Sequence, residues 1–295
     1  MVMAFRAYLL GCFLIFCIAT PLHAEEPPKH SVIVRNPCYN PGMFCVLNVV
    51  VGLLDFYEQG HFAGLKVDFA DQGLYYDSRK GPNWWSYYFE PVEIGDISNN
   101  PSEEGLGHDS IHCAFHTEFN LNRKRVHSLI NQYFHLKGHL KKEVSQFSKK
   151  NFQGYHVIGV HYRGTDKSSE APRVNYLDVY EALRKHIFDY RLKKYKIFVA
   201  TDEEAFLEYM LKRFPNRVVF QEAFRSKSGA PVHLTDNHEP YQRGKEALVD
   251  AILLSGTQFL IRTSSSLSLW STYFNPELPV LLLNTRYPGL GPPTS

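Results

Sequence analysis

The sequence predicts an α/β protein built from two Rossmann-like halves. The second half alternates short, β-branched apolar runs with amphipathic stretches, which is the pattern of parallel strands joined by helices. The first half opens in a similar way, with a strand, a turn-rich loop, an apolar helix and a second strand. The 295 residues are enough for two such halves, and we expect their boundary near residue 150.

The bulk composition is that of a globular protein, with 44% hydrophobic and 21% charged residues. A net charge of +2 argues against a nucleic-acid-binding protein, so any basic site must be local. The aromatic content of 14% suits a carbohydrate-binding protein and a well-filled core equally.

Residues 1–24 have the features of a targeting segment. Arg6 supplies a positive start, an apolar run covers residues 7–19, and Ala24 precedes two glutamates. The run is short for a membrane span of about 20 residues, so we expect a signal peptide cut after Ala24. A short signal anchor is the alternative, and it would give the chain its membrane contact.

Three cysteines remain beyond that segment: Cys38, Cys45 and Cys113. Three thiols cannot all pair within one chain. Cys38 and Cys45 could form a bridge in an oxidising compartment, and buried free thiols are the alternative.

The predicted first half, residues 25–150, begins with a strand at 32–35. A buried helix at 43–57 follows, because this run is apolar almost all round, and then a strand at 66–69. We expect Asn40 to cap the helix. The loop before it lacks the Gly-x-Gly-x-x-Gly spacing of a dinucleotide site, although N–H groups at the helix start could still face a ligand.

Residues 84–89 form an aromatic cluster, which we interpret as a packed corner; stacking on sugars is the alternative. Residues 96–110 are rich in Asn, Ser, Gly and acids and look like an exposed loop. Residues 122–149 predict an amphipathic helical region. His108, His112 and His116 would share one helical face, as metal ligands can, but Gly105 and its neighbours are poor helix sequence, so we predict no metal there.

The second half, residues 151–295, predicts five strands and four helices in regular alternation. The strands are expected at 157–161, 196–200, 217–220, 258–262 and 279–283, and the helices at 175–190, 203–213, 243–255 and 265–274. In the second of these helices the apolar residues lie on one face, Asp202 can cap the start and Pro215 ends it.

One strand end carries a dense group of polar side chains. The buried run 157–160 is followed within seven residues by His161, Arg163, Thr165, Asp166 and Lys167. The carboxyl edge of an open α/β sheet is where such folds bind ligands. A guanidinium grips phosphate with two donors and stays charged at every working pH, so Arg163 is the leading candidate.

This stretch, His-x-Arg-x-Thr-Asp-Lys after an apolar strand, resembles the first signature of the α1,6-fucosyltransferase and nodulation-fucosyltransferase family, in the superfamily that includes protein O-fucosyltransferases. Residues 197–202 and 259–270 resemble two later signatures in the same order. The resemblance covers roughly residues 150–285. It implies a GT-B-like glycosyltransferase fold, with residues 25–150 on the acceptor side and residues 151–295 binding a GDP-sugar, most readily GDP-fucose, without a metal.

The residues that follow the strands supply the predicted donor site. Hydroxyls and first-turn N–H groups at Thr263, Ser264, Ser265 and Ser266 could cradle a phosphate at the positive end of a helix, although the serines could instead only cap it. Asp202 could bind the guanine or ribose, or simply cap its helix. The resemblance adds Asp250, near the donor, and His161, at the nucleotide. The chain has no Asp-x-Asp pair of the kind that binds a catalytic metal.

The resemblance also suggests a general base. The family carries a catalytic glutamate one residue beyond Glu170, where this chain has Ala171, so assigning the role to Glu170 assumes a one-residue shift. The family often has a second arginine where this chain has Gly164.

The resulting hypothesis is an inverting, metal-independent fucosyltransferase that acts on a glycan or glycoprotein, with Arg163 and Glu170 as its catalytic residues. A catalytically inactive nucleotide-sugar-binding relative is the alternative. A secreted hydrolase is less favoured, because neither a Gly-x-Ser-x-Gly nor a His-Glu-x-x-His motif is present. The leader indicates export, and the Golgi lumen if the source is eukaryotic.

Overall fold

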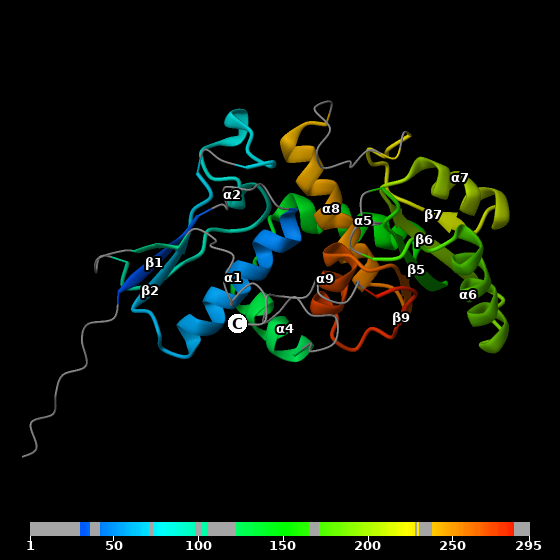
Figure 1. The fold of residues 1–295 in the computed structure, drawn as a ribbon, viewed down its shortest axis with the longest axis horizontal. Helices are drawn as coiled ribbons and strands as arrows, with labels where there is room; N and C mark the ends of the chain where they lie inside the picture. The colour runs from blue at the N-terminus through cyan, green and yellow to red at the C-terminus, as the bar shows by residue number, and fades with distance from the viewer. Residues whose placement is uncertain are drawn as a thin grey trace, which may run out of the picture.

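The computed structural model describes residues 30–35, 42–70, 73–97, 102–104, 122–165, 171–227, 229 and 238–285. Their strands form two separate sheets, one at each end of the molecule, with helices between and around them (Figure 1). This arrangement confirms the predicted α/β fold class. The predicted leader, Cys38, Cys113 and the three histidines at 108–116 lie outside the described residues.

The first sheet has four strands in the order β3-β2-β1-β4. The strands β1 (Ser31–Val34), β2 (Gly64–Val67) and β4 (Ser102–Glu104) run parallel, while β3 (Glu93–Gly95) is antiparallel to β2. The helix α1 (Met43–Glu58) connects β1 to β2, as the sequence predicts. It begins after an N-cap at Gly42, so the expected cap at Asn40 is wrong by two residues.

The second sheet has five strands, all parallel, in the order β7-β6-β5-β8-β9. They are β5 (His156–Tyr162), β6 (Tyr195–Thr201), β7 (Val218–Val219), β8 (Phe259–Arg262) and β9 (Val280–Leu282). From β5 the chain first builds outward through β6 and β7, then returns to the other side of β5 for β8 and β9. The point between β5 and β8 is therefore the topological switch at which open α/β sheets bind ligands.

Helices cover both faces of this sheet, which is why its central strands are apolar on both sides. The helices α6 (Tyr176–Asp189) and α7 (Glu204–Arg213) pack on Ile158 and Val160 of β5. The opposite face meets α8 (Pro240–Ser255) and α9 (Ser266–Phe274), with Val157 and Leu260 in the contact. These elements agree with the predicted ones to within a few residues.

A single hydrophobic cluster runs from one sheet to the other. It contains Val32 of β1, much of α1, and Leu260 of β8, and the helices α1, α4 (Arg123–Tyr133), α5 (Gly138–Asn151), α8 and α9 lie between the sheets (Figure 1). The two sheets therefore share one core, while the five-stranded sheet buries its other face in a second cluster with α6 and α7.

Two predictions about the first half need correction. The expected helical region 122–149 is two helices, α4 and α5, separated by an extended segment. That segment pairs with the aromatic corner, because Glu90 N–H donates to His135 O and Lys137 N–H to Tyr88 O. The expected loop 96–110 contains the strand β4, which pairs with β1. Its sequence, Ser-Glu-Glu, has no apolar residue that would predict a strand.

The aromatic cluster at 84–89 is a packed corner, as preferred above. Trp84, Trp85 and Tyr88 have no solvent exposure, and the short helix α2 (Trp85–Tyr88) carries them into the core. Buried rings cannot stack on an acceptor sugar, so the alternative interpretation is wrong for these three side chains.

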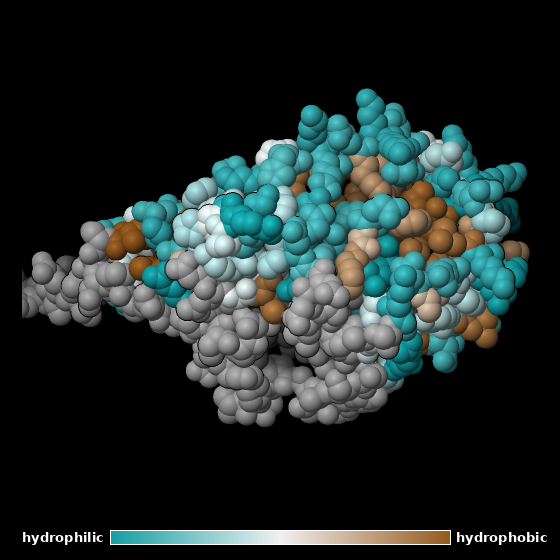
Figure 2. All heavy atoms as spheres, turned by 90° about the horizontal axis from the view of Figure 1, so that it is seen from above, coloured by the Kyte–Doolittle hydropathy of each residue, from teal (hydrophilic) through white to brown (hydrophobic). Residues whose placement is uncertain are grey.

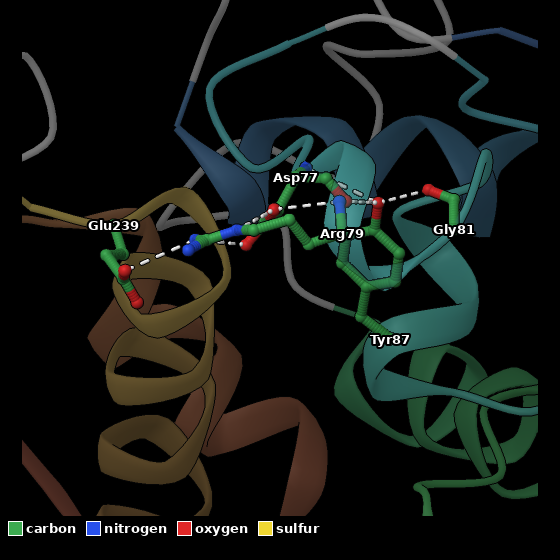
Figure 3. Close-up of polar contacts among 5 residues, drawn as sticks. All are labelled: Asp77, Arg79, Gly81, Tyr87 and Glu239. Carbon is green, nitrogen blue, oxygen red and sulfur yellow. Dashed lines mark hydrogen bonds and ion pairs between the residues drawn. The ribbon is translucent and has the colours of Figure 1, made fainter.

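A polar bridge joins this corner to the start of α8 (Figure 3). The 3-10 turn η1 (Ser78–Lys80) places Arg79 between Asp77, whose Oδ2 lies 2.9 Å from Nη2, and Glu239, whose Oε1 lies 3.2 Å from the same nitrogen. The hydrogen bond from Arg79 lowers the pKa of the Asp77 carboxyl. Both Arg79 and Glu239 are 66% exposed, so we expect the bridge to contribute little free energy.

Within the described residues, the helices are all too short or too polar to cross a membrane. Figure 2 shows a largely hydrophilic upper face, with hydrophobic residues gathered toward the end that holds the five-stranded sheet. Among the exposed large hydrophobic side chains are Leu177 and Phe188 of α6 and Leu211 of α7.

Candidate functional site

The polar residues that the sequence singles out meet at one edge of the second sheet. The register pairs Tyr162 with Thr201 and His161 with Arg262, so the carboxyl ends of β5, β6 and β8 lie side by side. Arg163, Asp202 and Thr263 are the residues that follow these three ends. The Arg163 N–H donates to Thr263 Oγ1 at 2.9 Å, which joins the tip of β5 to the serine run.

Asp202 organises the loop that follows β5. Its Oδ1 accepts from Gly164 N–H at 3.0 Å, and its Oδ2 accepts from Thr165 Oγ1 at 2.6 Å and lies 3.0 Å from Arg163 Nε. The N-cap of α7 is Glu203, so the expected capping role of Asp202 is wrong. Asp202 is instead the brace that orients Arg163, whose side chain is 18% exposed.

Gly164 occupies a position with no room for a side chain. A Cβ there would overlap the Glu203 carboxylate and the Tyr162 ring. Glu203 is itself held by Arg173, whose Nη2 donates to Oε1 at 2.7 Å while Nη1 donates to Gly164 O at 2.8 Å. An arginine at position 164 would therefore require the Glu203 and Tyr162 side chains to move.

The serine run forms the turn between β8 and α9. Ser264 N–H donates to Asn284 Oδ1 at 2.7 Å, and the amide of Asn284 donates onward to Pro172 O at 2.7 Å. Ser265 is the N-cap of α9, yet its side chain makes no capping hydrogen bond. The purely capping role considered above is thus wrong for Ser265, while Ser266 Oγ lies 3.8 Å from Cys45 Sγ of α1.

His161 points into the protein beside the same turn. It is 4% exposed, and within the described part of the chain its Nδ1 has no hydrogen-bond partner. Burial holds the pKa of this imidazole well below its ordinary value, and the positive charges of Arg262 and Arg163 lower it further. His161 is therefore neutral at physiological pH.

Asp250 lies on α8, buried to 8% exposure, and its Oδ1 has no hydrogen-bond partner among the described residues. Burial raises the pKa of this carboxyl to about 7; Arg225 opposes the rise and Glu246, one turn earlier, adds to it. A carboxyl poised near neutrality can donate or accept a proton in a hydrogen bond to a ligand.

The first half of the chain also reaches this edge. The Tyr75 hydroxyl accepts from Met43 N–H at 2.7 Å at the start of α1. Burial raises the pKa of Tyr75 to about 12, while the charges of Arg243 and Arg163 act in the opposite direction. The first turns of α1 and α9 thus lie in contact, at Cys45 and Ser266.

Two residues of this site have no assigned role in the sequence analysis. Arg262 ends β8 and contacts the serine turn, and Asn284 fixes it from beyond β9. Arg262 could have been found from strand alternation, since it is a charged residue at the end of an apolar run. Asn284 carries no such signal.

Asp166, Lys167 and Glu170 lie outside the described residues, so their predicted roles stay predictions. Among the residues the structure does describe, His, Cys, Asp and Glu side chains form no group of three that could hold a metal ion. The arrangement offers cations, hydroxyls and a helix N-terminus, which together suit an anionic ligand such as a diphosphate.

A sequence model of the nodulation protein Z (NodZ) family matches residues 120–286. A comparison with curated proteins finds no match.

Three solved structures illustrate the fold. The structure of NodZ α-1,6-fucosyltransferase soaked with GDP-fucose is 18% identical, covers 88% of this chain and 99% of its own, and has a TM-score of 0.56. The fucosyltransferase NodZ from Bradyrhizobium is 17% identical over the same shares, with a TM-score of 0.57. A mutant of Arabidopsis thaliana FUT1 in complex with GDP is 11% identical, covers 88% and 72%, and has a TM-score of 0.51.

Proposed function

The chain belongs to the nodulation protein Z family, and from this we propose that it is a fucosyltransferase that transfers fucose from GDP-fucose to a hydroxyl of a glycan or glycoprotein. Of the structures with this fold, the NodZ enzyme was soaked with GDP-fucose and the FUT1 mutant was solved in complex with GDP. The proposal extends that donor to this chain.

The observation that carries the proposal is the hydrogen bond between Arg163 and the turn that leads into α9, at the topological switch of the sheet. Arg163 is tied through its own N–H to Thr263 and through its guanidinium to Asp202. A departing diphosphate needs cations and N–H donors in place before the reaction, because donors that need no reorganisation stabilise developing charge best. This edge supplies both kinds of group.

The proposed reaction is a single displacement. The acceptor oxygen attacks the anomeric carbon of fucose while the bond between that carbon and the GDP oxygen breaks. The attack inverts the configuration at this carbon, and the electron pair of the broken bond stays on the diphosphate. Arg163 and the first turn of α9 neutralise that charge without a metal. Glu170 is proposed as the base that removes the acceptor proton.

A second candidate function is nucleotide-sugar binding without catalysis. Gly164 favours it, because the Glu203 carboxylate leaves no space there for a second cation. The test below separates the two functions.

The proposal places the mature protein in the secretory pathway. Arg6 and the apolar run 7–19 support export, and a GDP-sugar enzyme needs a compartment into which such donors are imported.

The test is calorimetric titration of residues 25–295 with GDP, GDP-fucose, GDP-mannose and UDP-glucose, followed by an assay of GDP release with and without glycan acceptors. We expect GDP and GDP-fucose to bind and UDP-glucose to bind far more weakly. The variant Arg163→Ala should lose at least tenfold in GDP affinity, whereas Arg191→Ala, on the surface after α6, should bind as the wild type does. Binding without acceptor-dependent release would support the second candidate, and no GDP binding would refute both.

A further inference from the structure

Arg262 is a buried guanidinium at the centre of the candidate site. It is the last residue of β8, is 2% exposed, and pairs in register with His161. Along β8, Ile261 packs toward α6 and α7, while Leu260 belongs to the core on the other face. Strand alternation therefore directs Arg262 to the face of α9, beneath the serine turn.

Two hydrogen bonds of Arg262 link it to that turn and to the first turn of α9. Its Nε donates to Ser268 Oγ at 2.9 Å, and its Nη2 donates to Ser265 O at 3.2 Å. The Ser268 hydroxyl in turn lies 3.3 Å from both Thr263 O and Ser265 O. Carbonyl oxygens of the turn are thus held on the inner side by Arg262 and Ser268. Carbonyl oxygens repel an anion, so engaging these two with Arg262 and Ser268 lowers that repulsion at the turn.

The charge of Arg262 also acts at the tips of the strands. Burial and then the charges of Arg262 and Arg163 lower the pKa of His161, so both guanidinium groups lie near one imidazole. A buried charge is screened by water and salt less than a surface charge is. The N-terminus of α9 adds its partial positive charge at the same place.

We propose that Arg262 is a positioning residue for the diphosphate of the nucleotide donor, which fixes the turn 263–266 and supplies a second positive charge behind it. The inference rests on the proposed function. It gives the site two cations from neighbouring strands, Arg163 at the tip of β5 and Arg262 at the end of β8. Position 164, beside Arg163, has no space for such a group.

Three variants separate this role from simple support of the fold. Arg262→Met removes the charge and keeps a long side chain, and Arg262→Lys keeps the charge but loses the planar fork of donors. Arg217→Met is the matched control. Arg217 also donates to a backbone carbonyl, Tyr195 O at 3.3 Å, and lies over the Tyr195 ring, at the opposite end of the strands.

The measurement is calorimetric titration of each variant with GDP, guanosine and inorganic pyrophosphate. We expect Arg262→Met to weaken GDP and pyrophosphate binding by about 30-fold and guanosine binding by less than about twofold, because guanosine has no phosphate. Arg262→Lys should recover most of that loss, and Arg217→Met should match the wild type. Equal losses for GDP and guanosine, or no loss for either, would overturn the inference.

A second readout needs no ligand. NMR titration of the His161 imidazole, assigned with His161→Gln, should show a higher pKa in Arg262→Met than in the wild type and no change in Arg217→Met. An unchanged His161 pKa in Arg262→Met would contradict the proposal that the charge of Arg262 acts at the tips of the strands.

The outcomes for the two proposals differ. If the wild type binds GDP but Arg262→Met binds it equally well, the inference fails and the proposed function stands. If the wild type binds pyrophosphate through Arg262 but shows no preference for GDP over UDP, the proposal of a GDP-sugar donor is wrong and the positioning role of Arg262 stands. If the wild type binds neither GDP nor pyrophosphate, both fail.

Discussion

At the scale of single residues, the site depends on side chains that hold one another before any ligand arrives. Asp202 collects Gly164 N–H, Thr165 Oγ1 and Arg163 Nε on one carboxylate. The carboxylate of Asp202 is largely buried and has three partners, so it does more than form a single ion pair with Arg163. The carboxylate defines where the Arg163 guanidinium lies.

We predict that Asp202→Asn weakens GDP binding by about 10- to 100-fold, because hydrogen bonds to a charged group contribute about 1.5–3 kcal/mol and the amide loses part of them. Calorimetry with GDP measures the effect. The control is Asp189→Asn, which removes an exposed pair with Lys185 at the end of α6. Tighter GDP binding in Asp202→Asn would mean that Asp202 only neutralises Arg163 and does not position it.

Asp250 gives the molecule a pH dependence with a definite sign. An unfolded aspartate has a pKa of about 3.9, and burial raises that of Asp250 to about 7. Between these values the folded protein binds a proton that the unfolded chain releases, so stability falls as pH rises from about 4 to about 7 and then levels off.

We therefore predict that Asp250→Asn gains stability relative to the wild type as pH rises, by up to about 4 kcal/mol between pH 4 and pH 8. Urea unfolding of both proteins across this range measures the difference. Glu181→Gln, on the surface of α6, serves as the control and should show no such trend. A constant difference between Asp250→Asn and the wild type at all pH values would contradict the raised pKa.

At the scale of elements, the contact between α1 and α9 joins the first and the last α-helix that the structure describes. Trp270 Nε1 donates to Asn48 Oδ1 at 2.7 Å, and both side chains are almost completely buried. Because α9 begins with the serine turn and α1 begins beside Cys45, this hydrogen bond also fixes how the first turns of the two helices lie in contact.

We predict that Asn48→Ala lowers the free energy of unfolding by about 1–3 kcal/mol, since it leaves the buried indole N–H without this acceptor. Urea denaturation gives the value, and Asn131→Ala on the exposed side of α4 should change it by less than about 0.5 kcal/mol. Repeating Asn48→Ala in a Trp270→Phe background tests the pair, because the cost should then shrink. An unchanged cost would show that the hydrogen bond contributes nothing.

The sequence was most informative where side-chain periodicity alone decides the structure. The strands β5, β6 and β8 are apolar runs buried on both faces, and the helices between them have one apolar face each. Arg163 and the serine run could be placed at one edge because parallel strands share a carboxyl end. The division of residues 122–149 into α4 and α5 could not be predicted, because it depends on pairing with Tyr88 and Glu90 from a distant segment.

The unpredicted parts of the site have the same cause. That Asp202 braces a loop and does not cap α7 follows from three contacts made across the sheet edge. Arg262 and Asn284 act through the turn 263–266, and spacing along the chain does not reveal which backbone groups they reach. The glycine at 164 is explained only by the Glu203 carboxylate that fills the space beside it.

At the scale of the whole molecule, the shared core decides how the protein unfolds. One hydrophobic cluster includes residues of β1 and β8 and the helices between them. Losing either sheet would expose part of this shared cluster, although Ile158 and Val160 would stay packed on α6 and α7.

We predict a single unfolding transition, with equal calorimetric and van't Hoff enthalpies, in scanning calorimetry of residues 25–295. Circular dichroism and tryptophan fluorescence should give the same midpoint, since Trp84 and Trp85 report on the first half and Trp270 on the second. Two separated transitions would show that the halves fold independently despite their common core.

Asn284 has a practical consequence for anyone who shortens this protein. It follows β9, the last strand that the structure describes, and its amide links the turn 263–266 to the segment before α6. A fragment trimmed to end with Leu282 would retain every sheet and helix that the structure describes and would look intact by circular dichroism. Its turn 263–266 would nonetheless have lost the hydrogen bond from Ser264 N–H to Asn284, so an inactive fragment of that kind would say nothing about the chemistry of the full chain.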